Sequence, residues 1–138
     1  WSIPPGPEEL ATALEIVNPR EVALFGIDPD LDAHNKFVNR LAGLINYALN
    51  HKEGKISVTA LAAAMAHREK TTRLGLAWMA AFGALTVVHD AGNTVIVTRN
   101  GAEDASALAL LTVELRAMLE ETAAYRRHFA RTGVEILL

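Results

Sequence analysis

The sequence predicts a mainly helical α+β fold: a winged helix-turn-helix with an N-terminal helix–strand extension and a long C-terminal helix. Two β-rich runs, 85–89 and 94–98, flank a short polar turn, as in a hairpin. The preceding segments alternate between helical spacing and one minimal strand, giving the order helix, strand, helix, turn, helix, hairpin. The competing interpretation is a generic helical domain with an incidental hairpin. The 138 residues, half of them apolar, suit one packed domain.

Residues 1–27 are expected to form the N-terminal helix–strand extension. Pro7 suits the first turn of a helix, and Asn18-Pro19 ends that helix. A short strand follows at 21–25. The chain has no initiating Met, and we interpret it as a piece of a longer protein.

Residues 28–101 are expected to form the winged-helix domain. Its first helix runs to about Asn50 and is followed by a minimal strand at 56–58. Thr59 is the expected N-cap of a short helix, and a second helix runs from about Lys70 to Phe82. Hairpin strands at 85–89 and 94–98, joined by a loop at 90–93, complete the domain.

Residues 102–138 are expected to pack on this domain as one long helix, from about Asp104 to Arg131. At 1.5 Å per residue such a helix is about 40 Å long, which exceeds the width of a winged-helix core. Its distal turns are therefore open to a partner or to a second copy. Its apolar stripe alternates spacings of three and four residues: Leu108, Leu111, Leu115, Met118, Thr122, Tyr125 and Phe129.

Basic residues are concentrated in one part of this acidic chain. The net charge is −3, yet residues 55–101 hold five basic and two acidic side chains. Cations at the start of a recognition helix contact phosphates and base edges. An ordinary solvated face, with ion pairs such as Glu69 to Arg73, is the alternative. The candidate nucleic-acid-binding residues are Arg68, Lys70, Thr71 and Arg73.

The second helix of the predicted helix-turn-helix is apolar on two sides. Leu76 and Met79 are expected to face the core, and Leu74, Trp78 and Phe82 form another stripe. We expect the last helix of the chain to cover this stripe, with a partner protein or a second copy as the alternative. The candidate interface residues are Trp78, Phe82, Tyr125 and Phe129.

Two polar patterns have simpler explanations than a site. Asp28, Asp30, Asp32 and His34 alternate like calcium ligands, but the glycine and glutamate of an EF-hand are missing. Acidic residues at a helix start suit the helix dipole, so no metal site is predicted. The other pattern is a face of the first helix that forms either a solvated or a polar contact surface: Asn35, Asn39, Asn46 and Asn50, with Gly43 among them.

The sequence contains no catalytic motif. No Walker loop, GxGxxG, GxSxG or HExxH pattern occurs, and there is no cysteine. The chain alone is therefore not expected to be an enzyme or to hold a cofactor. Its location is expected to be cytoplasmic, without a membrane anchor.

Two phrases resemble a known family. The run Pro19-Arg20-Glu21-Val22-Ala23-Leu24-Phe25-Gly26 precedes the predicted winged helix, and Leu119-Glu120-Glu121-Thr122-Ala123-Ala124-Tyr125-Arg126-Arg127-His128-Phe129 lies in the last helix. Together they resemble the carboxy-terminal region of bacterial RecJ-type single-stranded-DNA-specific exonucleases. The DHH and glycine-rich GGGH-type motifs of that family are missing, so the resemblance implies a non-catalytic part. It further implies docking to single-stranded-DNA-binding protein or assistance in contacting single-stranded DNA.

Two functions follow as hypotheses. The first is an accessory domain of a DNA-processing, RecJ-like exonuclease, which docks a protein partner or assists DNA binding. The alternative is a free-standing winged-helix transcriptional regulator that binds DNA as a homodimer formed through its last helix.

Overall fold

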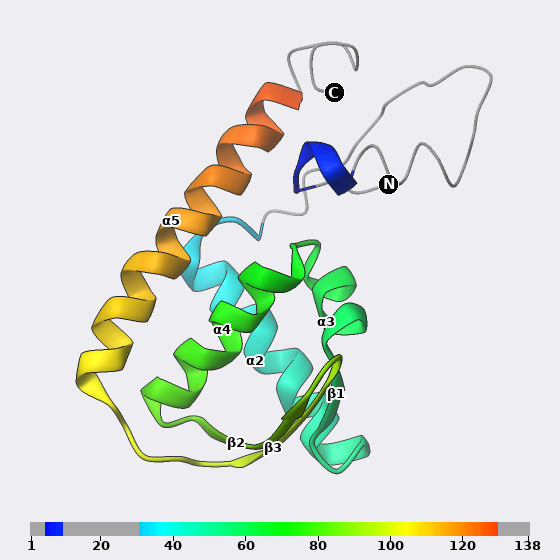
Figure 1. Ribbon diagram of the computed structural model, residues 1–138, viewed down its shortest axis with the longest axis vertical. Coiled ribbons are helices and arrows are strands. Elements are labelled where there is room, and N and C mark those ends of the chain that lie inside the picture. Colours follow the sequence, from blue (N-terminus) through cyan, green and yellow to red (C-terminus); the bar gives the residue numbers. More distant parts are fainter. Residues whose placement is uncertain (1–4, 10–30, 130–138) are drawn as a thin grey trace, which may run out of the picture.

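The computed structural model describes residues 5–9 and 31–129, and only the backbone of Phe129. Residues 7–9 are helical, whereas the strand expected at 21–25 and the tail beyond 129 lie outside the described residues. The described part is mainly helical, with a small three-stranded antiparallel sheet (Figure 1). Its elements are α2 (His34–His51), β1 (Lys55–Ser57), α3 (Val58–Met65), α4 (Glu69–Phe82), β2 (Leu85–Ala91), β3 (Thr94–Arg99) and α5 (Ala105–Phe129).

Local capping explains where two of these helices begin and end. Ser57, not Thr59, caps α3, because its hydroxyl accepts a hydrogen bond from the Ala60 N–H at 3.3 Å. The Thr59 hydroxyl lies instead against Glu69 and Asn93, so the expected cap was wrong by two residues. Gly83 ends α4, as predicted, with a φ of 90° that favours glycine.

The sheet has the order β1-β3-β2, so β3 pairs with both neighbours. The expected four-residue loop is shorter, because Asp90 and Ala91 still pair with β3 and leave only Gly92 and Asn93 in the turn. A bulge interrupts β2: Val87 pairs with Val97, but His89 pairs with Ile96. Val88 is therefore the extra residue of the outer strand.

The core lies between α2, α3, α4 and the sheet, and α5 closes one side. Leu76 and Met79 of α4 are buried, as expected from their spacing. Gly75 allows α2 and α4 to approach, because a Cβ at that position would lie 2.7 Å from atoms of both Phe37 and Leu41. Fully or nearly fully buried apolar side chains from the helices and the sheet form this core: Phe37, Leu41, Met65, Leu76, Leu85, Val95, Val97, Leu115 and Leu119.

The first half of helix α5 runs beside α4, and its second half continues past the start of α4 (Figure 1). Its buried face is not quite the predicted stripe, because Leu119 is buried where Met118 was expected, and because the buried face continues to Arg126, which was not in the stripe. An α-helix has 3.6 residues per turn, so a stripe written at a strict 3.5-residue period drifts around the helix. Leu108 and Leu111 are half-buried. No helix in residues 5–9 and 31–129 combines the length and the apolar character needed to cross a membrane.

Candidate functional site

The predicted cations gather at the start of α4 but are mostly engaged by acidic groups. Arg68 lies 3.5 Å from a Glu121 carboxylate oxygen of α5. Arg73 lies 3.3 Å from Asp90 and donates to the Gly92 carbonyl, so the hairpin holds it, and not Glu69 as in the alternative interpretation. Only Lys70, of the three, is exposed without a described ion-pair partner.

Thr71 is not accessible to a ligand. Its side chain is 0% exposed because it lies on the inner side of α4 with Thr72 and Gly75. Its hydroxyl has no hydrogen-bond partner among the described residues. The expectation of a nucleic-acid contact from Thr71 is therefore wrong for this conformation, because the rotation of α4 points that residue into the core.

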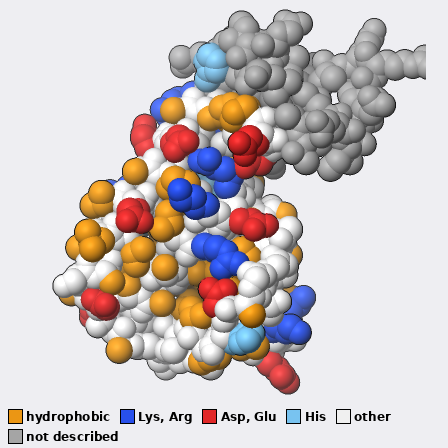
Figure 2. Space-filling view, viewed as in Figure 1, with side chains coloured by type: hydrophobic (Ala, Val, Ile, Leu, Met, Phe, Trp, Pro, Cys, Tyr) orange, Lys and Arg blue, Asp and Glu red, His pale blue; other side chains and the backbone are white. Residues whose placement is uncertain are grey.

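Acidic side chains neutralise the start of α4. Glu69 of α4 and Glu114 of α5 line a shallow hollow of about 460 Å³ together with Lys70, Arg73 and Leu74. Figure 2 shows the same interleaving of basic and acidic side chains over α4 and α5. Exposed ion pairs add little stability, but they cancel the local positive potential that would attract phosphate. We call the surface formed by Arg68, Lys70, Arg73, Glu114 and Glu121 the α4–α5 face.

The second apolar stripe of α4 is covered only in part. The Trp78 indole Nε1–H donates to the Thr112 hydroxyl of α5 at 2.9 Å, so α5 covers this ring as expected. The Phe82 ring stacks on Trp78 with centroids 5.2 Å apart, yet Phe82 remains 56% exposed. It is the last residue of α4, where the chain turns away through Gly83. The expectation of a buried Phe82 is therefore wrong.

Tyr125 is half-buried and lies far from these rings. Thirteen residues of helix separate it from Thr112, which is about 20 Å. Burial, and then the negative charge of Glu9, raise the pKa of its phenol. Trp78, Phe82 and Tyr125 therefore do not form one surface, and the side chain of Phe129 lies outside the described residues.

A buried polar cluster joins three segments that are far apart in the sequence: α5, the residues just before α2, and the turn between α3 and α4. The Arg126 guanidinium is 2% exposed, pairs with Asp32 and donates to the Ala66 carbonyl. The His67 Nε2 lies 3.2 Å from the Asp32 carboxylate and 3.1 Å from the Leu31 carbonyl. This cluster fixes α5 to the turn between α3 and α4. The sequence signal was a 3.6-residue stripe running from Leu115 through Leu119 and Thr122 to Arg126.

A smaller hollow of about 210 Å³ lies beside this cluster, between the start of α2 and α5. It is lined by Asp32, His34, Arg116 and Glu120, among others. Burial, and then the positive charge of Arg116, lower the pKa of His34. Asp32 is already paired with Arg126 and His67, which disfavours it as a free base or metal ligand. Within 5–9 and 31–129, no three side chains of the metal-binding types gather into a possible site.

Comparison with protein-family models, curated proteins and solved structures finds no match to this chain. Function must therefore be inferred from the geometry of the chain itself.

Proposed function

We propose that this chain is a non-catalytic accessory domain with winged helix-turn-helix architecture. In this proposal α3 and α4 are the helix-turn-helix, and the β2–β3 hairpin is the wing within domain 28–101. The element order and the β1-β3-β2 strand order support it. Residues 1–27 are then the extension, and residues 102–138 the added helix.

The proposed activity is docking of a protein partner rather than reading of duplex DNA by α4. One observation supports docking most strongly. Helix α5 covers part of α4, the helix that would enter a DNA groove, and it places Glu114 and Glu121 beside the cations of α4. A DNA-reading helix needs an uncovered polar face and unpaired cations. At the start of α4, acidic side chains pair with Arg68 and Arg73, so only Lys70 is both exposed and without a described ion-pair partner.

The outward side of α5 supplies an apolar surface for docking. Leu110 and Val113 are each 69% exposed. Ala117, which is also exposed, lies one helical turn after Val113 on the same side. Figure 2 shows hydrophobic side chains gathered along the first half of α5, at the left edge of the view. Large exposed aliphatic side chains in one stripe are typical of interaction surfaces.

The resemblance to RecJ-type exonucleases suggests the biological setting. We propose that the parent protein processes DNA, that its active site lies outside this chain, and that the docked partner is single-stranded-DNA-binding protein. A cytoplasmic location is part of this proposal, because a cysteine-free sequence suits a reducing compartment.

Titration of the chain with purified single-stranded-DNA-binding protein, followed by calorimetry, tests the proposal. We expect binding that is lost in the double variant Leu110→Asp, Val113→Asp, because two charges enter the apolar stripe. The variant Arg40→Glu, Lys52→Glu, Lys55→Glu, altered on α2 and just beyond it, is the control and should bind normally. Binding that survives the double variant would contradict docking through α5.

The chain alone should also show no metal-dependent cleavage of labelled single-stranded DNA.

The exposed stripe on α5 equally supports the alternative, a winged-helix regulator that dimerises through its last helix. Light scattering of the chain alone separates the two. A dimer that becomes a monomer in the Leu110→Asp, Val113→Asp variant would favour the regulator. A monomer at all concentrations would favour the accessory domain.

A further inference from the structure

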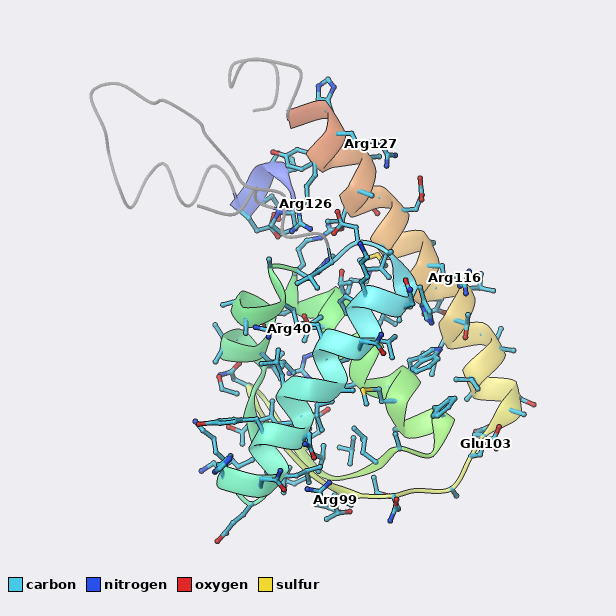
Figure 3. All side chains as sticks on the ribbon, turned by 180° about the vertical axis from the view of Figure 1, so that it is seen from behind. Arg40, Arg99, Glu103, Arg116, Arg126 and Arg127 are labelled. Atoms are coloured by element: carbon cyan, nitrogen blue, oxygen red, sulfur yellow. The ribbon has the colours of Figure 1, made fainter. Side chains whose placement is uncertain are left out.

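The outward side of α2 is basic, because this helix carries cations and no acidic residue. Between His34 and His51 it contains Lys36 and Arg40 but neither Asp nor Glu. Lys52, Glu53 and Lys55 follow directly, and Arg99 of β3 reaches the same side. Among these described residues, five side chains are basic and one, Glu53, is acidic. We call this surface the α2 face; Figure 3 looks onto it, with Arg40 and Arg99 labelled.

Four cations of the α2 face, Arg40, Lys52, Lys55 and Arg99, are available to bind an anion. Arg40, Lys52 and Lys55 are exposed, and none of them has an ion-pair partner in the described part of the chain. Arg99 is bonded to amide oxygens and not to a carboxylate, so its charge is not cancelled. Unpaired cations spaced along a surface are what a phosphate backbone requires.

An exposed aromatic pair lies among these cations. Tyr47 is 56% exposed, and its ring centroid lies 4.6 Å from that of His51, one helical turn further along. Such a ring presents a flat apolar face on which a ligand can stack. A nucleobase is a suitable cover, because every base has a flat π-face that stacks on such rings.

The middle of the α2 face is rich in amide side chains. Asn39, Asn46 and Asn50 are exposed, and Arg99 donates to the Asn46 and Asn50 side-chain oxygens, at 3.1 Å for Asn46. On the surface of α2, Gly43 lies between these three asparagines and Tyr47. A Cβ at Gly43 would meet nothing within 4 Å, so no contact inside the protein requires glycine there. Glycine weakens a helix, and its presence suits close approach of a ligand to the backbone.

From these observations we infer that the α2 face binds single-stranded nucleic acid. Arg40, Lys52, Lys55 and Arg99 contact the phosphates, and Tyr47 with His51 stacks on an unpaired base. Single strands fit better than duplex, because stacked bases inside a duplex do not offer their faces to Tyr47. The inference does not depend on the docking proposal, which concerns α5.

Fluorescence anisotropy with labelled oligothymidylate, and with a duplex and an RNA of equal length, tests the inference. The expected log–log salt slope for four phosphate contacts on a single strand is about −3. The variant Arg40→Glu, Lys52→Glu, Lys55→Glu should weaken binding about tenfold or more and flatten this slope. The matched control, Arg68→Glu, Lys70→Glu, Arg73→Glu, removes as many cations from the α4–α5 face and should leave affinity within about threefold. The reverse pattern would overturn the inference.

The Tyr47 side chain separates stacking from simple charge attraction. Tyr47→Ala should reduce affinity for oligothymidylate about fivefold or more, whereas Tyr47→Phe should retain it. Neither variant should change binding of heparin, which has charge but no bases. If duplex binds more tightly than the single strand, or if Tyr47→Ala binds normally, the surface does not recognise single strands.

Gly43→Gln distinguishes a ligand role from a structural one. Glutamine is a better helix former than glycine and has open space at this position, so the thermal midpoint should stay or rise. The same side chain would obstruct the centre of the α2 face and should weaken oligothymidylate binding several-fold. Unchanged affinity in a stably folded Gly43→Gln protein would contradict a ligand lying across α2.

Discussion

The α4–α5 face and the α2 face both carry several cations, but they differ in what surrounds each charge. On the α4–α5 face, Arg68 and Arg73 lie beside Glu121 and Asp90, and Glu114 lines the hollow next to Lys70. On the α2 face, Arg40, Lys52 and Lys55 have no ion-pair partner among the described residues. The two surfaces therefore present different potentials, because acidic neighbours offset the cations of one and not those of the other.

This difference shows why charge counted along the sequence is a poor guide to a binding surface. The acids that neutralise the start of α4 come from the hairpin and from α5, up to 53 residues away in the chain. Electrostatic potential depends on distances in space, so partners brought in by the fold decide which cations remain available.

The largest expected effect concerns the buried end of α5, where neighbouring arginines have opposite environments. Arg126→Ala removes the arginine partner of the largely buried Asp32 carboxylate, so we expect a loss of about 3–5 kcal/mol in the free energy of unfolding. Arg127→Ala is the control, because Arg127 is largely exposed and should cost about 0–1 kcal/mol. Urea unfolding measures both. Figure 3 shows the two side chains pointing to opposite sides of α5. Equal effects would mean that the cluster does not hold α5 in place.

A second comparison uses two helical glycines. Gly75→Ala places a Cβ 2.7 Å from Phe37 and Leu41 atoms, so overpacking should destabilise the protein by about 1–3 kcal/mol. Gly43→Ala, on the open α2 face, should stabilise it by about 0.5–1 kcal/mol. Thermal and urea unfolding of the two variants provide the measurement. A loss of stability in Gly43→Ala would show that this glycine has a structural role.

A third variant tests whether the acidic side chains alone prevent the α4–α5 face from binding DNA. Glu114→Gln with Glu121→Gln removes two negative charges and should change stability by no more than about 1 kcal/mol. It should create weak, salt-sensitive binding of duplex DNA, because Arg68 and Lys70 then lack acidic neighbours on α5. Anisotropy with labelled duplex measures the gain. If none appears, the covering position of α5, and not its charge, excludes DNA.

The smallest expected effect is a pH dependence at the place where α2 meets α5. Burial and Arg116 lower the pKa of His34 below its usual 6.5, so the unfolded chain binds a proton more readily than the folded chain. Stability is therefore expected to fall as the pH drops through about 6.5 towards the lower folded-state pKa. His34→Gln should flatten this slope, measured as the thermal midpoint between about pH 8 and about pH 5. A slope that is the same in the His34→Gln variant as in the original chain would contradict this assignment.

The sequence predicted the order of α2 to β3 and the long α5, because helical spacing, Gly83 and the β-rich runs are local signals. The winged-helix interpretation of that order remains a prediction. The contacts that decide the surfaces could not be predicted, because they join distant residues: Arg126 to Asp32, Arg99 to Asn46, and Arg68 to Glu121. Thr71 was misjudged for a related reason. Its exposure depends on the rotation of α4 about its axis, which spacing alone left ambiguous.

The bulge at Val88 has a consequence for the behaviour of the protein at high concentration. β2 is an outer strand of the sheet, and its free side offers unpaired backbone groups to any other extended chain. The extra residue breaks the regular spacing of those groups and increases the local twist, so an added strand could not keep register across it. His89 and Asp90 follow immediately and add polar side chains to that edge. The bulge thus protects the hairpin from edge-to-edge aggregation, although Val87 and Val88 are exposed.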